Sequence, residues 1–214
     1  MQKPSYSPLY VRLVAFYVAT LLISNILAVK QFTVLGATLP TAVLVFPVVY
    51  ILSDVFSEVY GYRASRNTRY LAFGCNLFMN IMFMIGIALP AAASFTAQDA
   101  MVAILGNTPR ILLASFAGFL IGDLVNDRVF KRMKAKHPDS SKGFKFRAVL
   151  SSLFGELCDS ALFYPIAFAG ILPLELMVQM GLLQACVKTL YEFVISPVTL
   201  WIVNKAKKYE GIGA

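Results

Sequence analysis

The stretch LVFPVVYILSDVFSEVYGYRASRNTR, residues 44–69, is an apolar run of helical length that carries two carboxylates near its end. Asp54 and Glu58 are four positions apart, so they lie on one face of a helix. Ionisable side chains in a bilayer are costly, and they usually face a cavity or a partner rather than lipid. Gly61 then ends the run, and a basic loop is expected to follow. The stretch therefore predicts a membrane helix with an acidic inward face.

The composition of the whole chain is that of a membrane protein. Its 214 residues are 58% hydrophobic and only 14% charged, with a mean hydropathy of +0.71. This length suits a single transmembrane domain, residues 1–214, without a soluble module. The 3 cysteines lie far apart in apolar runs and lack CxxC spacing. They therefore indicate neither a disulfide nor a metal site, and we expect no cofactor.

Apolar runs predict an all-α, polytopic fold with six transmembrane helices. The expected helices lie at about residues 10–30, 40–60, 69–90, 109–130, 148–172 and 182–204. Between the third and fourth, residues 91–108 are expected to form a loop with a short interfacial helix. Pro165 is expected to bend the fifth helix. The second and fifth helices both carry close acid pairs, as a three-plus-three inverted repeat would require.

The basic residues gather on one side of this predicted topology. They are Lys3, Arg12, Arg63, Arg66, Arg69, the basic residues of the expected loop 131–147 (which also holds the only histidine, His137), Lys205, Lys207 and Lys208. The positive-inside rule then places both termini in the cytoplasm. We interpret the basic loops as topology signals that contact anionic lipid, so nucleic acid is not an expected partner.

Polar side chains recur at similar depths in five or six of the predicted helices. They include Asn25, Asp54, Asn76, Asn80, Asp123, Glu156, Asp159, Lys188 and Glu192. One interpretation is structural: Lys188 pairs with Glu192 at i, i+4 and the asparagines bond across helices. The other is a substrate pathway. A single intramembrane lysine cannot neutralise this many acids, so some carboxylates are left for protons, water or a ligand.

This excess of acids limits the ligand. An organic anion would be repelled, so a neutral or cationic solute fits better. A carboxylate accepts two hydrogen bonds side by side, which suits a flat edge with adjacent N–H donors, as in guanine-type bases. Aromatic side chains could stack on such a ring. An enzyme is not expected, because the one histidine lies in a cytoplasmic loop and no P-loop is present.

Several segments together resemble the queuosine precursor transporters of the vitamin uptake transporter family. They are ISNILAVKQF, LPTAVLVFPVVYILSDVFSEVYGYRASR, TPRILLASFAGFLIGDLVND, GELCDSALFYPIAF and KTLYEFVISPVT, in the family's order over nearly the whole chain. The resemblance implies a multi-pass protein of the bacterial inner membrane. It implies import of 7-cyano-7-deazaguanine and 7-aminomethyl-7-deazaguanine for salvage into the tRNA base queuosine.

The resemblance also implies roles for individual residues. The substrate-binding set is Asn25, Asp54, Asn76, Glu156, Asp159, Lys188 and Glu192. The structural or gating set is Lys30, Glu58, Arg63, Arg110 and Asn126. Glu156 stands where many members of the family have a glutamine, which alters the local charge.

An alternative class is the substrate-binding membrane subunit of a vitamin-type ABC importer. Such subunits are also basic, have six helices and need a partner ATPase. Ala15 and Ala19, a small-xxx-small pair in the first helix, would form a docking surface, although such pairs are frequent in membrane helices. For the complete transporter, the expected partners are the deazaguanine substrate, the lipid bilayer and a second copy in a homodimer.

Overall fold

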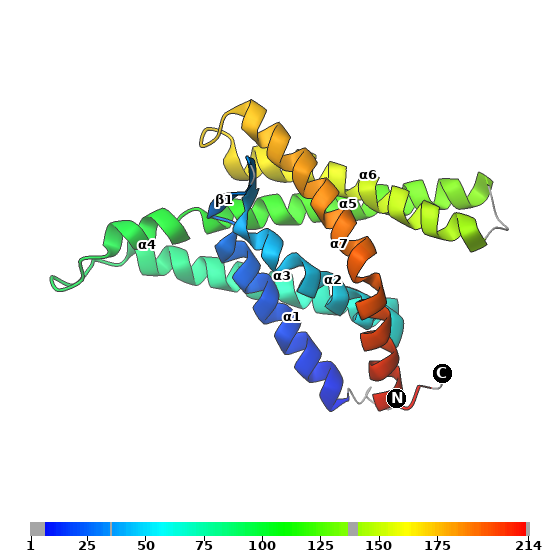
Figure 1. Ribbon diagram of the computed structural model, residues 1–214. Coiled ribbons are helices and arrows are strands. Elements are labelled where there is room, and N and C mark those ends of the chain that lie inside the picture. The colour runs from blue at the N-terminus through cyan, green and yellow to red at the C-terminus, as the bar shows by residue number, and fades with distance from the viewer. Residues whose placement is uncertain (1–6, 35, 137–140, 213–214) are drawn as a thin grey trace.

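The computed structural model describes residues 7–34, 36–136 and 141–212, which are mostly helical. The main helices are α1 (Pro8–Leu27), α2 (Phe46–Val55), α3 (Gly61–Ala88), α4 (Gln98–Leu105), α5 (Thr108–Lys136), α6 (Ser141–Phe168) and α7 (Leu174–Tyr209). The shorter elements are strands β1 (Gln31–Val34) and β2 (Ala37–Pro40), a 3₁₀ turn η1 (Thr41–Leu44) and a π-helical turn η2 (Phe56–Tyr60). Figure 1 shows their arrangement.

Within the described residues, 4 helical stretches are long and apolar enough to cross a membrane. They are Pro8–Leu27, Phe46–Ala88, Gln98–Asn126 and Leu174–Tyr209. Large apolar side chains point outward along them, among them Phe78, Leu113 and Phe193, which are about two-thirds exposed. Exposed apolar surfaces of this size are rare in soluble proteins. The prediction of a helical membrane protein, made from the composition, is therefore confirmed.

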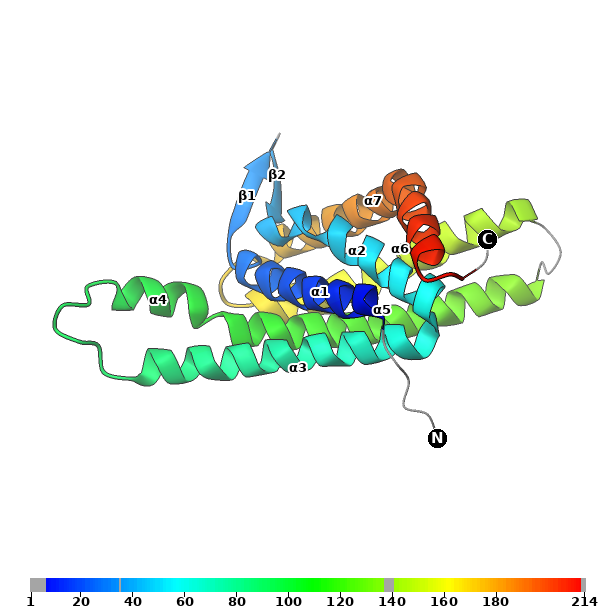
Figure 2. The same ribbon diagram turned by 90° about the horizontal axis from the view of Figure 1, so that it is seen from below.

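The chain reverses direction at Gly61, between α2 and α3. The backbone of Gly61 has φ +83° and ψ 166°, a region essentially confined to glycine. Figure 2 shows α3 running back alongside the elements that precede it. The predicted glycine stop is therefore present, but the predicted basic loop is wrong. The first turns of α3 contain Arg63, Arg66 and Arg69. The guanidinium of Arg66 lies over the ring of Tyr62, and the guanidinium of Arg69 lies over the ring of Phe119.

A β-hairpin precedes α2, where the sequence pattern suggested only a connection. Strands β1 and β2 are antiparallel, with Gln31 opposite Pro40 and Val34 opposite Ala37. The hydroxyls of Thr33 and Thr38 are bonded across the strands at 3.0 Å. Because this hairpin and η1 occupy residues up to 44, α2 begins at Phe46 rather than near residue 40.

The structure confirms one predicted connection, the segment 91–108, and differs from the other, the loop 131–147. The short helix expected within residues 91–108 is present as α4. The expected loop 131–147 is mostly helical, because α5 continues to Lys136 and α6 begins at Ser141; His137 lies outside the described residues. Pro165 lies inside α6, which ends at Phe168. Strong helix-forming Lys and Arg residues extend these helices past the apolar run on which the prediction rested.

Helices α5 and α6 approach closely through glycines. A Cβ atom on Gly122 would lie 2.9 Å from the carbonyl oxygen of Gly155, and one on Gly155 would lie 2.9 Å from that of Gly122. Small residues at such crossings let membrane helices pack backbone against backbone. An apolar cluster that includes Phe163, Tyr164, Phe168 and Met180 closes one end of this bundle.

The ends of the elements divide between two sides of the molecule. The starts of α1 and α3, the end of α7 and the facing ends of α5 and α6 lie towards one side (Figures 1 and 2). The hairpin, α4 and the connection from α6 to α7 lie towards the other. The ends on the first side carry basic residues: Arg12 lies near the start of α1, Arg63 near the start of α3, and Lys205 and Lys207 near the end of α7. The sequence analysis predicted this charge asymmetry.

We predict that Gly61→Ala destabilises the protein although it meets no steric obstacle. A Cβ on Gly61 has nothing within 4 Å, so the cost is the strained backbone alone, about 1–3 kcal/mol. Thermal unfolding of the purified protein in detergent measures it as a lower midpoint. The control is Gly74→Ala, also without a neighbour within 4 Å but inside helix α3. Equal midpoints for the two variants would contradict the strain at Gly61.

Candidate substrate site

A polar cavity of about 490 Å³ lies between the helices, a volume typical of small-molecule sites. Helices α1, α2, α5, α6 and α7 all contribute to its wall, together with the start of α3. Its polar lining consists of Tyr17, Ser24, Asn25, Tyr50, Ser53, Asp54, Ser57, Tyr62, Arg69, Ser115, Asp123, Asn126, Ser152, Glu156, Asp159, Gln184, Lys188 and Glu192.

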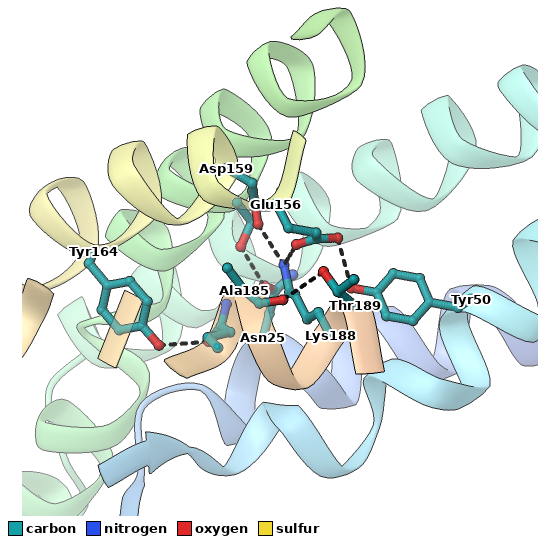
Figure 3. Close-up of polar contacts among 10 residues, drawn as sticks. Asn25, Tyr50, Glu156, Asp159, Tyr164, Ala185, Lys188 and Thr189 are labelled. Carbon is teal, nitrogen blue, oxygen red and sulfur yellow. Dashed lines mark hydrogen bonds and ion pairs between the residues drawn. The ribbon is translucent and has the colours of Figure 1, made fainter. Parts of the chain in front are cut away.

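Lys188 occupies the centre of this cavity, between two carboxylates. Its ammonium nitrogen lies 2.7 Å from Glu156 Oε2 and 2.6 Å from Asp159 Oδ2, as Figure 3 shows. Glu156 also accepts a hydrogen bond from the Tyr50 hydroxyl at 3.2 Å. The ring of Phe46 lies 4.9 Å from the same ammonium. We call Lys188, Glu156 and Asp159 the central triad.

The central triad follows from helical spacing on two helices. Glu156 and Asp159 are three positions apart, so both face α7 from α6. Lys188 is only 7% exposed, and a buried ammonium requires charged or hydrogen-bonding partners. The local pair of Lys188 with Glu192 considered from the sequence is not formed. Glu192 instead accepts a hydrogen bond from the Ser152 hydroxyl at 3.2 Å.

Asn25 and Asn76 bond across helices, as the structural interpretation expected, whereas Asn80 bonds within α3. Asn25 of α1 donates to Asn76 Oδ1 at 2.8 Å, and Ser115 of α5 donates to Asn25 Oδ1 at 3.2 Å. Asn80 donates to the backbone carbonyl of Asn76 at 2.9 Å. Asn25 lines the cavity, whereas Asn76 is fully buried behind it. Asn76 therefore supports the cavity wall without forming part of the surface that a ligand would meet.

The cavity carries an excess of negative charge. Its described lining contains five carboxylates (Asp54, Asp123, Glu156, Asp159 and Glu192) and two cations, Arg69 and Lys188. Asp54, Asp123 and Glu192 are exposed, so they form the open part, whereas the central triad lies deeper. This distribution agrees with the argument that one lysine cannot neutralise the intramembrane acids.

Comparison with known proteins gives the family. The family described as putative vitamin uptake transporter matches residues 40–202. The chain belongs to this vitamin uptake transporter family. A protein of Bacillus subtilis (strain 168) named "Probable queuosine precursor transporter" is 24% identical over 185 residues, which are 86% of this chain and 79% of that protein. No solved structure matches the chain. The family makes the cavity a candidate transport site.

The structural or gating set does not form one cluster. The resemblance to the vitamin uptake transporter family assigned this role to its residues. Lys30 is exposed, and its carbonyl accepts from Thr41 at the base of the hairpin. Glu58 pairs with Lys207 at 3.5 Å, and Arg63 is exposed on α3. Arg110 donates to the carbonyls of Ile166 and Ala169 at the end of α6. Asn126 lines the cavity.

Two neighbours of the central triad were missed by the sequence analysis. Tyr50 holds Glu156, and Gln184 lines the cavity one turn before Lys188 on α7. Gln184, Lys188 and Glu192 recur at intervals of four, so they share one helix face. This spacing was the signal that could have identified Gln184 as part of the site in this member of the vitamin uptake transporter family.

We predict that Gly118→Ala disturbs the central triad. A Cβ on Gly118 would overlap Asp159 Oδ1 and lie 2.9 Å from the Asp159 carbonyl oxygen, so the carboxylate must move away from Lys188. Thermal unfolding in detergent should show a clearly lower midpoint, because breaking a buried ion pair costs about 3–5 kcal/mol. Gly86→Ala is the control, since its Cβ meets only the tip of Met101 at 3.6 Å.

A double-mutant cycle separates this effect from general crowding. In an Asp159→Ala background the carboxylate is already gone and only the contact with the backbone carbonyl of residue 159 remains, so Gly118→Ala should lower the midpoint less. An equal loss in both backgrounds would show that Gly118 acts on α5–α6 packing and not on the carboxylate.

Proposed function

We propose that this chain imports the queuosine precursors 7-cyano-7-deazaguanine and 7-aminomethyl-7-deazaguanine across the bacterial inner membrane. The observation that carries the proposal is the acid-rich cavity around Lys188, whose carboxylates offer acceptors to a ligand with N–H donors. The family and the queuosine precursor transporter of Bacillus subtilis support a transport role. Transport needs binding and release, and no bond of the substrate is broken.

The base binds through its donor edge. A carboxylate among Glu156, Asp159 and Glu192 accepts from N1–H and the 2-amino group, because each carboxylate oxygen has two acceptor positions. Glu156 and Asp159 keep free positions while they hold Lys188. Asn25 lies on the same wall and meets a remaining polar group of the base. Phe46, Tyr50 and Phe163 line the cavity and provide rings that can stack on the ligand.

The chain crosses the membrane six times. The apolar stretch Phe46–Ala88 contains the reversal at Gly61, so it supplies two antiparallel segments. Helix α6, with 28 residues, is long enough for a further span. By the positive-inside rule, the side with the starts of α1 and α3 is cytoplasmic. Tyr62 and Arg69, in the first turns of α3, line the cavity, so the cavity opens towards the cytoplasm.

The importer acts without an ATPase partner. The family and the relative are both named as transporters, which favours a complete importer over the substrate-binding subunit of an ABC system. Ala15 and Ala19 are exposed on α1 and offer a surface for a second copy of the chain. The homodimer and the three-plus-three repeat remain predictions.

We predict that reporter fusions place both termini in the cytoplasm. A fluorescent protein that folds only in the cytoplasm should be bright at either end of the chain. A periplasmic phosphatase inserted in the connection at residues 91–97 should be active, because this segment lies on the opposite side (Figure 1). An active phosphatase fused to the C-terminus would contradict the topology.

We predict that Asp159→Ala and Glu192→Ala each reduce uptake at least tenfold. Liposomes that contain only this protein would be assayed with radiolabelled 7-cyano-7-deazaguanine, with unlabelled guanine and adenine as competitors. Guanine should compete and adenine should not, because only guanine presents the N1–H and 2-amino donors. Glu175→Ala is the matched control, since Glu175 is an exposed carboxylate in the first turn of α7 and does not line the cavity.

Normal uptake by both site variants would contradict the proposed site. Tight binding to the wild type without uptake would show that a partner subunit is required.

A further inference from the structure

Gln184 places an amide in the deep part of the cavity. Its side chain projects from α7 and is 2% exposed. The hydroxyl of Tyr164, itself 1% exposed on α6, donates to Gln184 Oε1 at 2.7 Å. Figure 3 shows Tyr164 at the edge of the group that holds Lys188, Glu156 and Asp159.

The Tyr164 hydroxyl is bonded to the oxygen end of the amide. Because Gln184 Oε1 is occupied by Tyr164, the amide nitrogen is the end left for the cavity that Gln184 lines. In the part of the chain that the structure describes, no acceptor contacts that nitrogen. The amide nitrogen is not among the buried side-chain atoms without a partner, so it keeps access to the cavity, and a ligand that covers this donor must offer it an acceptor. This donor therefore marks a position for an acceptor atom of a ligand.

The amide donor and the carboxylate acceptors line the same cavity. Gln184 and Lys188 are one turn apart on α7, about 6 Å along the axis. Lys188 in turn lies within 2.7 Å of both carboxylates of the central triad. A ligand edge with one acceptor beside two donors therefore meets one complementary group at each position.

We infer that Gln184 is a specificity-determining residue that donates a hydrogen bond to the 6-carbonyl oxygen of a guanine-type base. The inference rests on the proposed function, and it names Gln184 as the residue that binds the acceptor atom of the same ligand. A carboxylate of the site accepts from N1–H and the 2-amino group. A 6-amino compound would place an N–H donor opposite the N–H donor of the amide. Both donors would be left unpaired, and a site rejects such a ligand strongly. Tyr164 acts as a positioning residue, because it holds the amide in this orientation.

Competition binding to the purified full-length protein tests the inference. The probe is radiolabelled 7-cyano-7-deazaguanine, and the competitors are 7-deazaguanine and 2,6-diamino-7-deazapurine, which differ at C6 (oxo or amino) and at N1, where only the 6-oxo compound carries a hydrogen. The wild type should prefer the 6-oxo compound by about tenfold to a hundredfold, the range expected for one buried hydrogen bond.

Three variants give distinct results. Gln184→Met keeps the length without the amide, so it should weaken 6-oxo binding and reduce the preference to the part that N1–H contributes. Gln184→Glu replaces the donor with an acceptor, so the preference should shift towards the 6-amino compound. Tyr164→Phe should reduce the preference partially, because the amide can then rotate. Gln98→Met is the control: Gln98 donates to the carbonyl of Ile87 and does not line the cavity, and the preference should stay unchanged.

The outcomes separate the inference from the proposed function. If Gln184→Met binds the probe and keeps the full preference for the 6-oxo compound, the inference is overturned while the proposed function stands. If the wild type does not bind the probe, the proposed function fails and the inference fails with it. Should Gln184→Glu not fold, Gln184→Met alone decides, because it adds no buried charge.

Discussion

The structure depends on one contact, the pair of salt bridges that the Lys188 ammonium forms with Glu156 and Asp159. Removing an ammonium from water is expensive, and only close, well-oriented partners offset the cost. The requirement links α7 to α6 at mid-length and leaves both carboxylates facing inward. All three groups of this contact line the cavity. Tyr50 and Phe46 add contacts from α2, so three helices meet at this point.

The same contact sets the chemistry of the cavity. Lys188 neutralises only part of the charge that lines the cavity, and both Glu156 and Asp159 belong to that lining. Asp54, Asp123 and Glu192 extend the negative lining towards the opening. This negative lining disfavours an anion, and under the proposed function it offers acceptors to a flat ligand with N–H donors near the opening and again at the central triad. Gln184 then adds the opposite polarity beside those acceptors.

Local spacing predicted which residues face inward, but it did not predict their partners. The pattern identified Asn25, Asp54, Glu156, Asp159, Lys188 and Glu192, all of which line the cavity. It offered Glu192 as the local partner of Lys188, whereas packing of α6 against α7 supplies two nearer carboxylates. Because α3 begins at Gly61, Asn76 lies about 22 Å along the helix, at the level of Asn25. Helix starts set by glycine conformation and by a short hairpin are tertiary features that apolar periodicity does not report.

The glycines of α5 and the acid of α6 are parts of one arrangement. Aspartate has a short side chain, so Asp159 reaches Lys188 only from a backbone held at a definite distance from α7. Gly118 and Gly122 let α5 pass so close to α6 that a methyl group at Gly118 would overlap the carboxylate. The α5 backbone thus closes the far side of Asp159, and the carboxylate is directed to Lys188 at 2.6 Å. A larger residue on α5 would separate the helices and free the carboxylate to turn. The small residues therefore orient the charge as well as permit close packing.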